Sequence, residues 1–252
     1  MILVTLADLP RRAAFPTTRI TLIHAARSGS GPRAQKALST LCRAYWYPIY
    51  ACVRRFGFSP DEAEDLTQGF FTRVLEKNYL RDFERRRGRF RSFLLGTLKH
   101  FIANERDAAR ALKRGGARTA LPLDDLMRDA ERRYSLEPRD SLTPERIFER
   151  QWALALLARV FDQLQAEAAE SGKGAQFDRL KGLLVGDDND TGYRALAAEL
   201  DMTEGALKIA VHRLRQRFKE RLREEIAHTV ADPDDVGDEL RYLMAAIRSA
   251  VL

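Results

Sequence analysis

The stretch SPDEAEDLTQGFFTRV, residues 59–74, contains both the start signal and the buried face of a helix. Ser59 offers a capping hydroxyl, Pro60 suits the first helical position, and Glu62 stands three residues after the cap. Apolar residues then recur at the spacing of one helical face: Leu66, Phe70 and Val74. The stretch therefore predicts an amphipathic helix with a strongly defined beginning.

The same apolar spacing continues on both sides of this helix. It predicts helices over residues 34–56, 89–111, 144–170, a short one ending at 184, then 193–200 and 204–227, and a last one after Asp232 and Pro233. Thr143, followed by Pro144, is expected to cap the helix over 144–170. No strand pattern competes with these helices. We therefore expect an all-α protein made of two small helical domains joined by a linker, followed by a C-terminal helix.

The expected domain organisation follows from where the periodicity stops. Residues 1–18 show no sustained period and are expected to form a flexible arm, and residues 113–142 turn from basic to acidic and are expected to be the linker. The two domains would then be 19–112 and 143–228, with a helical tail over 229–252. The apolar face of the tail is expected to pack on the protein, and autoinhibition by the tail is a hypothesis: Leu240, Leu243, Met244 and Ile247.

Composition narrows the class of function. Lys and Arg total 43 against 36 Asp and Glu, and this net charge of +7 favours a polyanionic partner. Cys42 and Cys52 form no metal-binding pattern and are expected to be buried thiols. The histidines are scattered and no phosphate loop or nucleophile motif occurs, so neither enzymatic activity nor a metal or other cofactor is expected. The chain has no membrane-length apolar run, and a cytoplasmic location is expected.

Positive charge is concentrated in two places, of which the first is residues 81–118. Arginines there alternate with aromatic residues, a mixture that suits phosphates and unpaired bases. The expected contacts to single-stranded DNA are Phe83, Arg85, Arg86, Arg87, Arg89 and Arg91. The alternative is that the phenylalanines belong to the core and the arginines to an ordinary solvated surface.

The second basic region is the predicted helix over 204–227, which follows the helix over 193–200 after a short turn. Two helices joined this way suggest a helix-turn-helix, with Thr203 as the cap of the recognition helix. Lys208, His212 and Arg213 would point into a major groove, and Arg215 and Arg217 would reach phosphates. The alternative is a basic surface helix with no specific partner.

These two halves together resemble the RNA polymerase sigma-70 family. Residues 62–68, EAEDLTQ, resemble the Ala-Glu-Asp-Leu-x-Gln signature of sigma region 2, and GRFRSFL follows at 88–94. Residues 193–197, YRALA, and 204–208, EGALK, resemble the Tyr-x-x-Ile-Ala and x-Gly-Thr-Val-Lys segments of region 4. The resemblance covers about residues 20–228 and is to the small extracytoplasmic-function group, whose members carry only regions 2 and 4.

The resemblance implies a role for each surface. The acidic helix would bind the beta-prime clamp helices of core RNA polymerase, whose beta flap would be a second contact, through Asp61, Glu64, Asp65, Leu66, Gln68 and Phe71. Helix-dipole complementarity explains the acidic first turn equally well. The −10 promoter element would meet Lys99, His100 and Asn104 beside the arginine-rich loop. The −35 element would meet Thr203, Lys208, Ile209, His212 and Arg213.

Two positions depart from the family pattern. Ile209 stands where the family usually has a small polar residue. Asp201 replaces the usual glycine of the turn, although aspartate tolerates the left-handed conformation that such a turn demands.

The implied function is that of a sigma factor, which binds core polymerase, directs it to promoter DNA and assists opening; an anti-sigma factor would be a further partner. One alternative is a helix-turn-helix repressor that acts without polymerase. Another is a nucleic-acid-processing enzyme with Asp61, Glu64 and Asp65 as metal ligands, although adjacent helical residues diverge.

Overall fold

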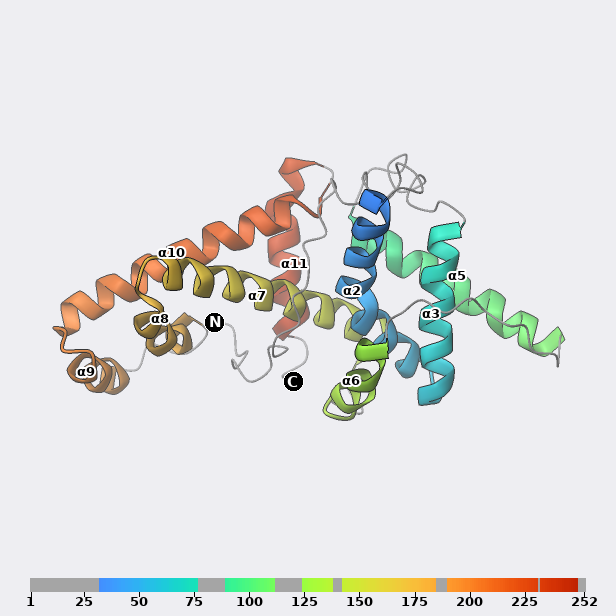
Figure 1. Cartoon of the computed structure of the whole chain (residues 1–252), viewed down its shortest axis with the longest axis horizontal. Coiled ribbons are helices and arrows are strands. Elements are labelled where there is room, and N and C mark those ends of the chain that lie inside the picture. The colour runs from blue at the N-terminus through green and yellow to red at the C-terminus, as the bar shows by residue number, and fades with distance from the viewer. Residues whose placement is uncertain are drawn as a thin grey trace.

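The computed structural model describes residues 32–76, 89–111, 124–137, 142–184, 190–230 and 232–248, and these residues form helices (Figure 1). Within them no strand is present, and the one extended pairing is an isolated antiparallel bridge between Arg89 and Val230. The all-α expectation is confirmed. The predicted N-terminal arm over 1–18 lies outside the described residues.

Three helices form the first half of the molecule: α2 (Pro32–Arg55), α3 (Pro60–Glu76) and α5 (Phe90–Ala111). The cap predicted at Ser59 is present, because the Glu62 amide donates to the Ser59 hydroxyl at 3.3 Å. The Glu62 carboxylate in turn accepts from the Ser59 amide at 2.8 Å. This reciprocal pair satisfies amides that would otherwise lack partners at the helix start.

The second half contains α7 (Pro144–Glu170), α8 (Gly174–Leu180), the short helix η2 (Lys181–Leu184), α9 (Asp190–Glu199) and α10 (Glu204–Ala227). The predicted caps at Thr143 and Thr203 are both formed, since each hydroxyl accepts an amide hydrogen bond from the first turn of its helix. The chain then passes η3 (Pro233–Asp235) into α11 (Val236–Arg248).

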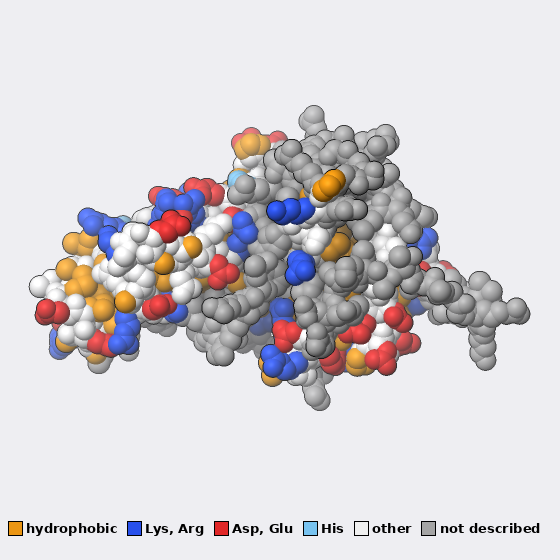
Figure 2. Space-filling model, in the orientation of Figure 1, with side chains coloured by type: hydrophobic (Ala, Val, Ile, Leu, Met, Phe, Trp, Pro, Cys, Tyr) orange, Lys and Arg blue, Asp and Glu red, His pale blue; other side chains and the backbone are white. Residues whose placement is uncertain are grey.

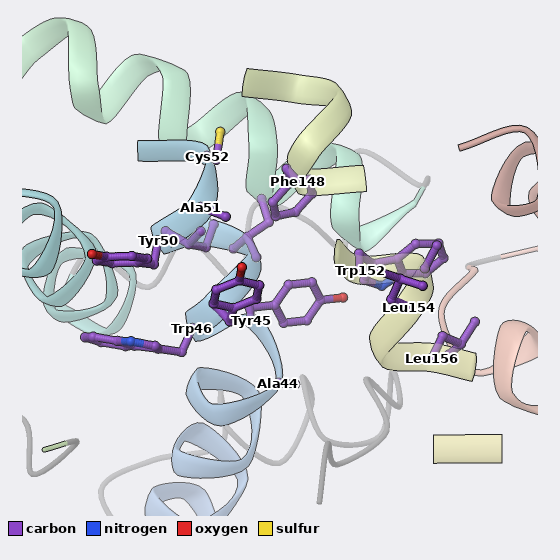
Figure 3. Packing of buried hydrophobic residues seen from close by; sticks show 14 of the residues in the cluster. Ala44, Tyr45, Trp46, Tyr50, Ala51, Cys52, Phe148, Trp152, Leu154 and Leu156 are labelled. Atoms are coloured by element: carbon purple, nitrogen blue, oxygen red, sulfur yellow. The ribbon is translucent and has the colours of Figure 1, made fainter. Parts of the chain in front are cut away.

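Helix α7 connects the two halves through one core. Its first half packs on α2, where Phe148 stacks on Tyr45 with ring centroids 6.4 Å apart (Figure 3). Its second half packs on α8 and α10, where Phe161 meets Phe218. A single buried cluster therefore extends from α2 through α7 to α10 and α11, across the position where the sequence predicted a domain boundary.

The predicted linker over 113–142 contains a helix that the sequence analysis did not expect, α6 (Asp124–Ser135). This helix packs on α2, and Arg54 donates two hydrogen bonds of 2.9 Å to the Glu131 carboxylate. Tyr50 donates to the same carboxylate at 2.5 Å. The C-terminal part of this interval is thus attached to the first half of the molecule by charged hydrogen bonds.

Helix α11 packs on α7 and α10 and lies between the two ends of the molecule (Figure 1). Leu243 and Ile247 are buried, and Leu240 and Met244 pack against the same core. The expectation that the apolar face of the tail packs on the protein is confirmed. Among the described helices, none combines the length and the apolar character that a membrane crossing requires.

Candidate nucleic-acid interface

The turn between α9 and α10 fixes the direction of the candidate recognition helix. Asp201 has a φ of 51°, so the left-handed conformation predicted for this residue is confirmed. The amide of Met202 donates to Ala197, which closes the end of α9, and Thr203 then caps α10. A small separate core holds the two helices together: Leu180, Tyr193, Ala197, Leu207 and Val211.

The first turns of α10 carry the residues expected to face DNA bases. Lys208, His212 and Arg213 are exposed, and Ile209 is 56% exposed, an unusual value for a large apolar side chain. The ammonium group of Lys208 lies 6.0 Å from the ring centre of Tyr193, so α9 supports the start of this surface. The structure therefore displays these four residues together.

Two arginines expected to reach phosphates are instead turned toward the protein. Arg215 donates two hydrogen bonds to the Leu183 carbonyl, the shorter at 2.7 Å. Arg217 pairs with Glu167 of α7 at 3.2 Å and with Glu220 at 3.4 Å. In this conformation Arg215 links α10 to η2, whereas Arg217 remains exposed beside α7.

A cleft of about 720 Å³ between α7, α8 and α10 has no counterpart in the sequence prediction. Its lining includes Ile209 and Arg213 on one side and Phe177 and Leu164 on the other. Figure 2 shows apolar side chains gathered at this end of the molecule, with Lys and Arg side chains near them. Ile209 and Arg213 thus border the cleft as well as the exposed face of α10.

The second candidate surface lies on α5, where His100 and Asn104 are exposed, as expected for contact residues. Lys99 is half exposed and pairs with Glu145 of α7 at 2.8 Å. The expected contacts in the preceding loop lie outside the described residues: Phe83, Arg85, Arg86 and Arg87. The described part of this surface is therefore the outer face of α5 and the residue before it, Arg89.

Arg91 differs most from its expected role. Only 4% of its side chain is exposed, and its guanidinium donates to both oxygens of Glu239, at 2.5 and 3.0 Å. Burial lowers the pKa of Arg91, but the hydrogen bonds to Glu239 and the charge of that carboxylate outweigh burial and raise it overall. A charged pair this deep cannot reach a phosphate, so the expected DNA contact by Arg91 is not formed in this conformation.

Part of the acidic surface on α3 is exposed to solvent. Asp61 and Asp65 are exposed, and Glu64 and Gln68 are partly exposed. Burial, followed by the charges of Asp61 and Asp65, raises the pKa of Glu64. The crowding of like charge thus occurs at the residues expected to bind polymerase.

Leu66 and Phe71 were expected in the same contact but belong to the core. Leu66 is buried, and Phe71 stacks on Trp46 of α2 with centroids 5.8 Å apart. The sequence signature therefore mixes residues that build α3 with residues that α3 exposes, and spacing alone did not separate the two kinds.

Comparisons with known protein families, with characterised proteins and with solved structures find no match for this chain. Among the described residues, no three His, Cys, Asp or Glu side chains lie close enough together to hold a metal ion, and this includes the trio Asp61, Glu64 and Asp65.

Proposed function

We propose that this protein is a sigma factor of the sigma-70 family, which binds core RNA polymerase, directs it to specific promoters and assists DNA opening. The observation that carries the proposal is the exposed start of α10, where a capped helix follows a left-handed turn residue and displays Lys208, His212 and Arg213. A short helix followed by a capped basic helix is the arrangement with which many proteins enter a major groove.

The acidic side chains of α3 support the second half of the proposal. Asp61, Glu64 and Asp65 lie on a different helix from the basic residues of α10, in the half of the chain formed by α2 and α3. Such a group repels phosphates, so it would not contribute to DNA binding itself. A protein that bridges DNA and a basic surface of another protein requires both signs of charge.

The decisive experiment is run-off transcription with purified bacterial core polymerase on a library of promoter fragments, together with a pull-down of the polymerase. Specific initiation that is lost in the double variant Glu64→Lys, Asp65→Lys would support the proposal. The control reverses two exposed acidic residues at the other end of the molecule, Glu170→Lys and Asp178→Lys, and should leave initiation intact.

The same experiment distinguishes a sigma factor from the alternative, a helix-turn-helix repressor. Binding to a palindromic DNA site without any association with polymerase would replace the proposal by that of a helix-turn-helix repressor.

A further inference from the structure

The first turn of α11 is attached to the start of α5 by a buried carboxylate. Glu239 is 1% exposed, and both of its oxygens accept hydrogen bonds from Arg91. Its Oε2 atom also lies 2.9 Å from Nε of Arg89. One carboxylate thus pairs with two arginines of the surface on which the single-stranded DNA contact is expected.

Aromatic rings complete the enclosure of Arg91. Its guanidinium carbon lies 4.0 Å from the ring centre of Tyr242, one turn after Glu239 in α11, and 5.2 Å from that of Trp152 in α7. A guanidinium that stacks on aromatic faces while it binds a carboxylate through two nitrogens is held in one orientation.

Helix α7 supplies further acidic partners to the same face of α5. Glu149 accepts a hydrogen bond from Arg91 at 3.3 Å, and Glu145, one turn earlier, pairs with Lys99 at 2.8 Å. The described basic residues of the predicted −10 surface, Arg89, Arg91 and Lys99, therefore each meet a carboxylate from the C-terminal half of the chain. His100 and Asn104 stay exposed beside them.

Helix-dipole complementarity does not explain this arrangement. A negative charge in the first turn of α11 is favourable wherever it points, and Asp238 meets that need at the surface, where it pairs only with Arg241 among the contacts described. Glu239 is instead withdrawn from water, which costs solvation that an apolar side chain would not lose. Leu243 and Ile247 are buried and already hold α11 on the core. Attachment of α11 therefore does not by itself explain why Glu239 is buried.

A carboxylate bound by a guanidinium through two nitrogens presents two oxygens and one negative charge, as a phosphate of DNA does. We infer that Glu239, with Glu145 and Glu149, acts as an intramolecular substitute for DNA phosphates, and that α11 must leave α5 before Arg89 and Arg91 can bind single-stranded DNA. This inference rests on the proposed function, since it concerns the regulation of the same α5 surface. It assigns α11 the role of an autoinhibitory element.

The test compares Glu239→Gln with Asp238→Asn in the full chain. The glutamine keeps the size of the side chain but removes the charge that holds Arg91, whereas the control removes a neighbouring charge at the surface of the same helix. If closed molecules dominate, affinity for a fluorescent single-stranded oligonucleotide should rise about tenfold in Glu239→Gln, since apparent affinity scales with the open fraction. Hydrogen exchange in α11 should rise in parallel, and Asp238→Asn should change neither.

A covalent lock tests the same idea from the opposite direction. Arg89 and Val230 form an isolated antiparallel bridge, in which paired Cα atoms lie about 4.5–5.5 Å apart, within reach of a disulfide. In Arg89→Cys, Val230→Cys, oxidation should fix the segment between α10 and α11 to the residue before α5 and lower oligonucleotide affinity, and reduction should restore it. Comparison of the two redox states of one protein corrects for the loss of Arg89.

Equal oligonucleotide binding by the oxidised and reduced forms would overturn the inference, as would faster exchange in α11 of Glu239→Gln without a gain in affinity. In both cases initiation by the wild-type chain with core polymerase would show that the proposed function stands without the autoinhibitory contact. If the wild-type chain and Glu239→Gln both fail to bind polymerase and DNA, the proposed function and the inference fail together.

Discussion

At the residue scale, Glu64 and Glu62 have opposite electrostatic environments within one helix start. Burial and the charges of Asp61 and Asp65 raise the pKa of Glu64, so its contribution to stability is present at acidic pH and is lost as pH rises through the folded-state pKa. Hydrogen bonds from Ser59 lower the pKa of Glu62, so its contribution is present at neutral pH and is lost as pH falls.

We therefore predict that Glu64→Gln stabilises the protein at pH 7 by about 0.2–0.5 kcal/mol, the size of relieved like-charge pairs on a helix. The same variant should bind polymerase less well. Glu62→Ala should be less stable than wild type at pH 7, and its deficit should shrink toward pH 4. Urea unfolding at both pH values measures these changes, and a loss of stability at pH 7 in Glu64→Gln would contradict the electrostatic explanation.

Base contacts and phosphate contacts on α10 should respond differently to mutation. Lys208 lies at the exposed start of the helix beside Tyr193. Lys219, exposed about three turns later, is expected from its position to reach phosphates. Lys208→Ala should cost about 1–3 kcal/mol against the preferred promoter and relax sequence preference. Lys219→Ala should weaken binding to all duplexes alike. It should also reduce, by about 1, the slope of the logarithm of the binding constant against the logarithm of the salt concentration. Duplex binding at several salt concentrations measures both effects, and identical profiles for the two variants would contradict the assignment.

At the element scale, the start of α10 depends on the left-handed conformation of Asp201. Glycine adopts this conformation without a steric penalty, so Asp201→Gly should leave stability nearly unchanged. Asp201→Val should destabilise the protein by about 1–2 kcal/mol, because a β-branched side chain meets the backbone there. Denaturant unfolding measures the stability of both variants. DNA binding should also fall in Asp201→Val, because α10 loses its fixed direction. An equal effect of both substitutions would show that the turn does not impose this conformation.

Local signals in the sequence predicted where helices begin and where the chain turns, but they did not predict how the helices pack on one another. The caps at Ser59, Thr143 and Thr203 and the left-handed turn at Asp201 could be predicted, because each depends on residues within a few positions of one another. Helix α6 was missed, since its attachment depends on Glu131 meeting Arg54 from a distant part of the chain. Arg91 looked like a solvated arginine for the same reason: its partner, Glu239, lies 148 residues away.

At the scale of the whole molecule, α7 makes the two halves of the chain depend on one another. The first half of α7 is buried against α2, and its later turns belong to the same cluster as α10 and α11. The start of α10 has a core of its own with α9, built around Leu207 and Val211. Stability should therefore divide into a large cooperative unit centred on α7 and a smaller unit around the turn.

This division predicts different consequences for two buried truncations. Phe148 and Leu207 are both fully buried, the first in the large cluster and the second in the small one. Phe148→Ala should cost about 3–5 kcal/mol, and hydrogen exchange should accelerate in α2, α7 and α11 together. Leu207→Ala should lower the free energy of local opening by about 2–5 kcal/mol. It should accelerate hydrogen exchange mainly in α9 and the first turns of α10. If Phe148→Ala instead left α11 protected, the two halves of the chain would be independent domains.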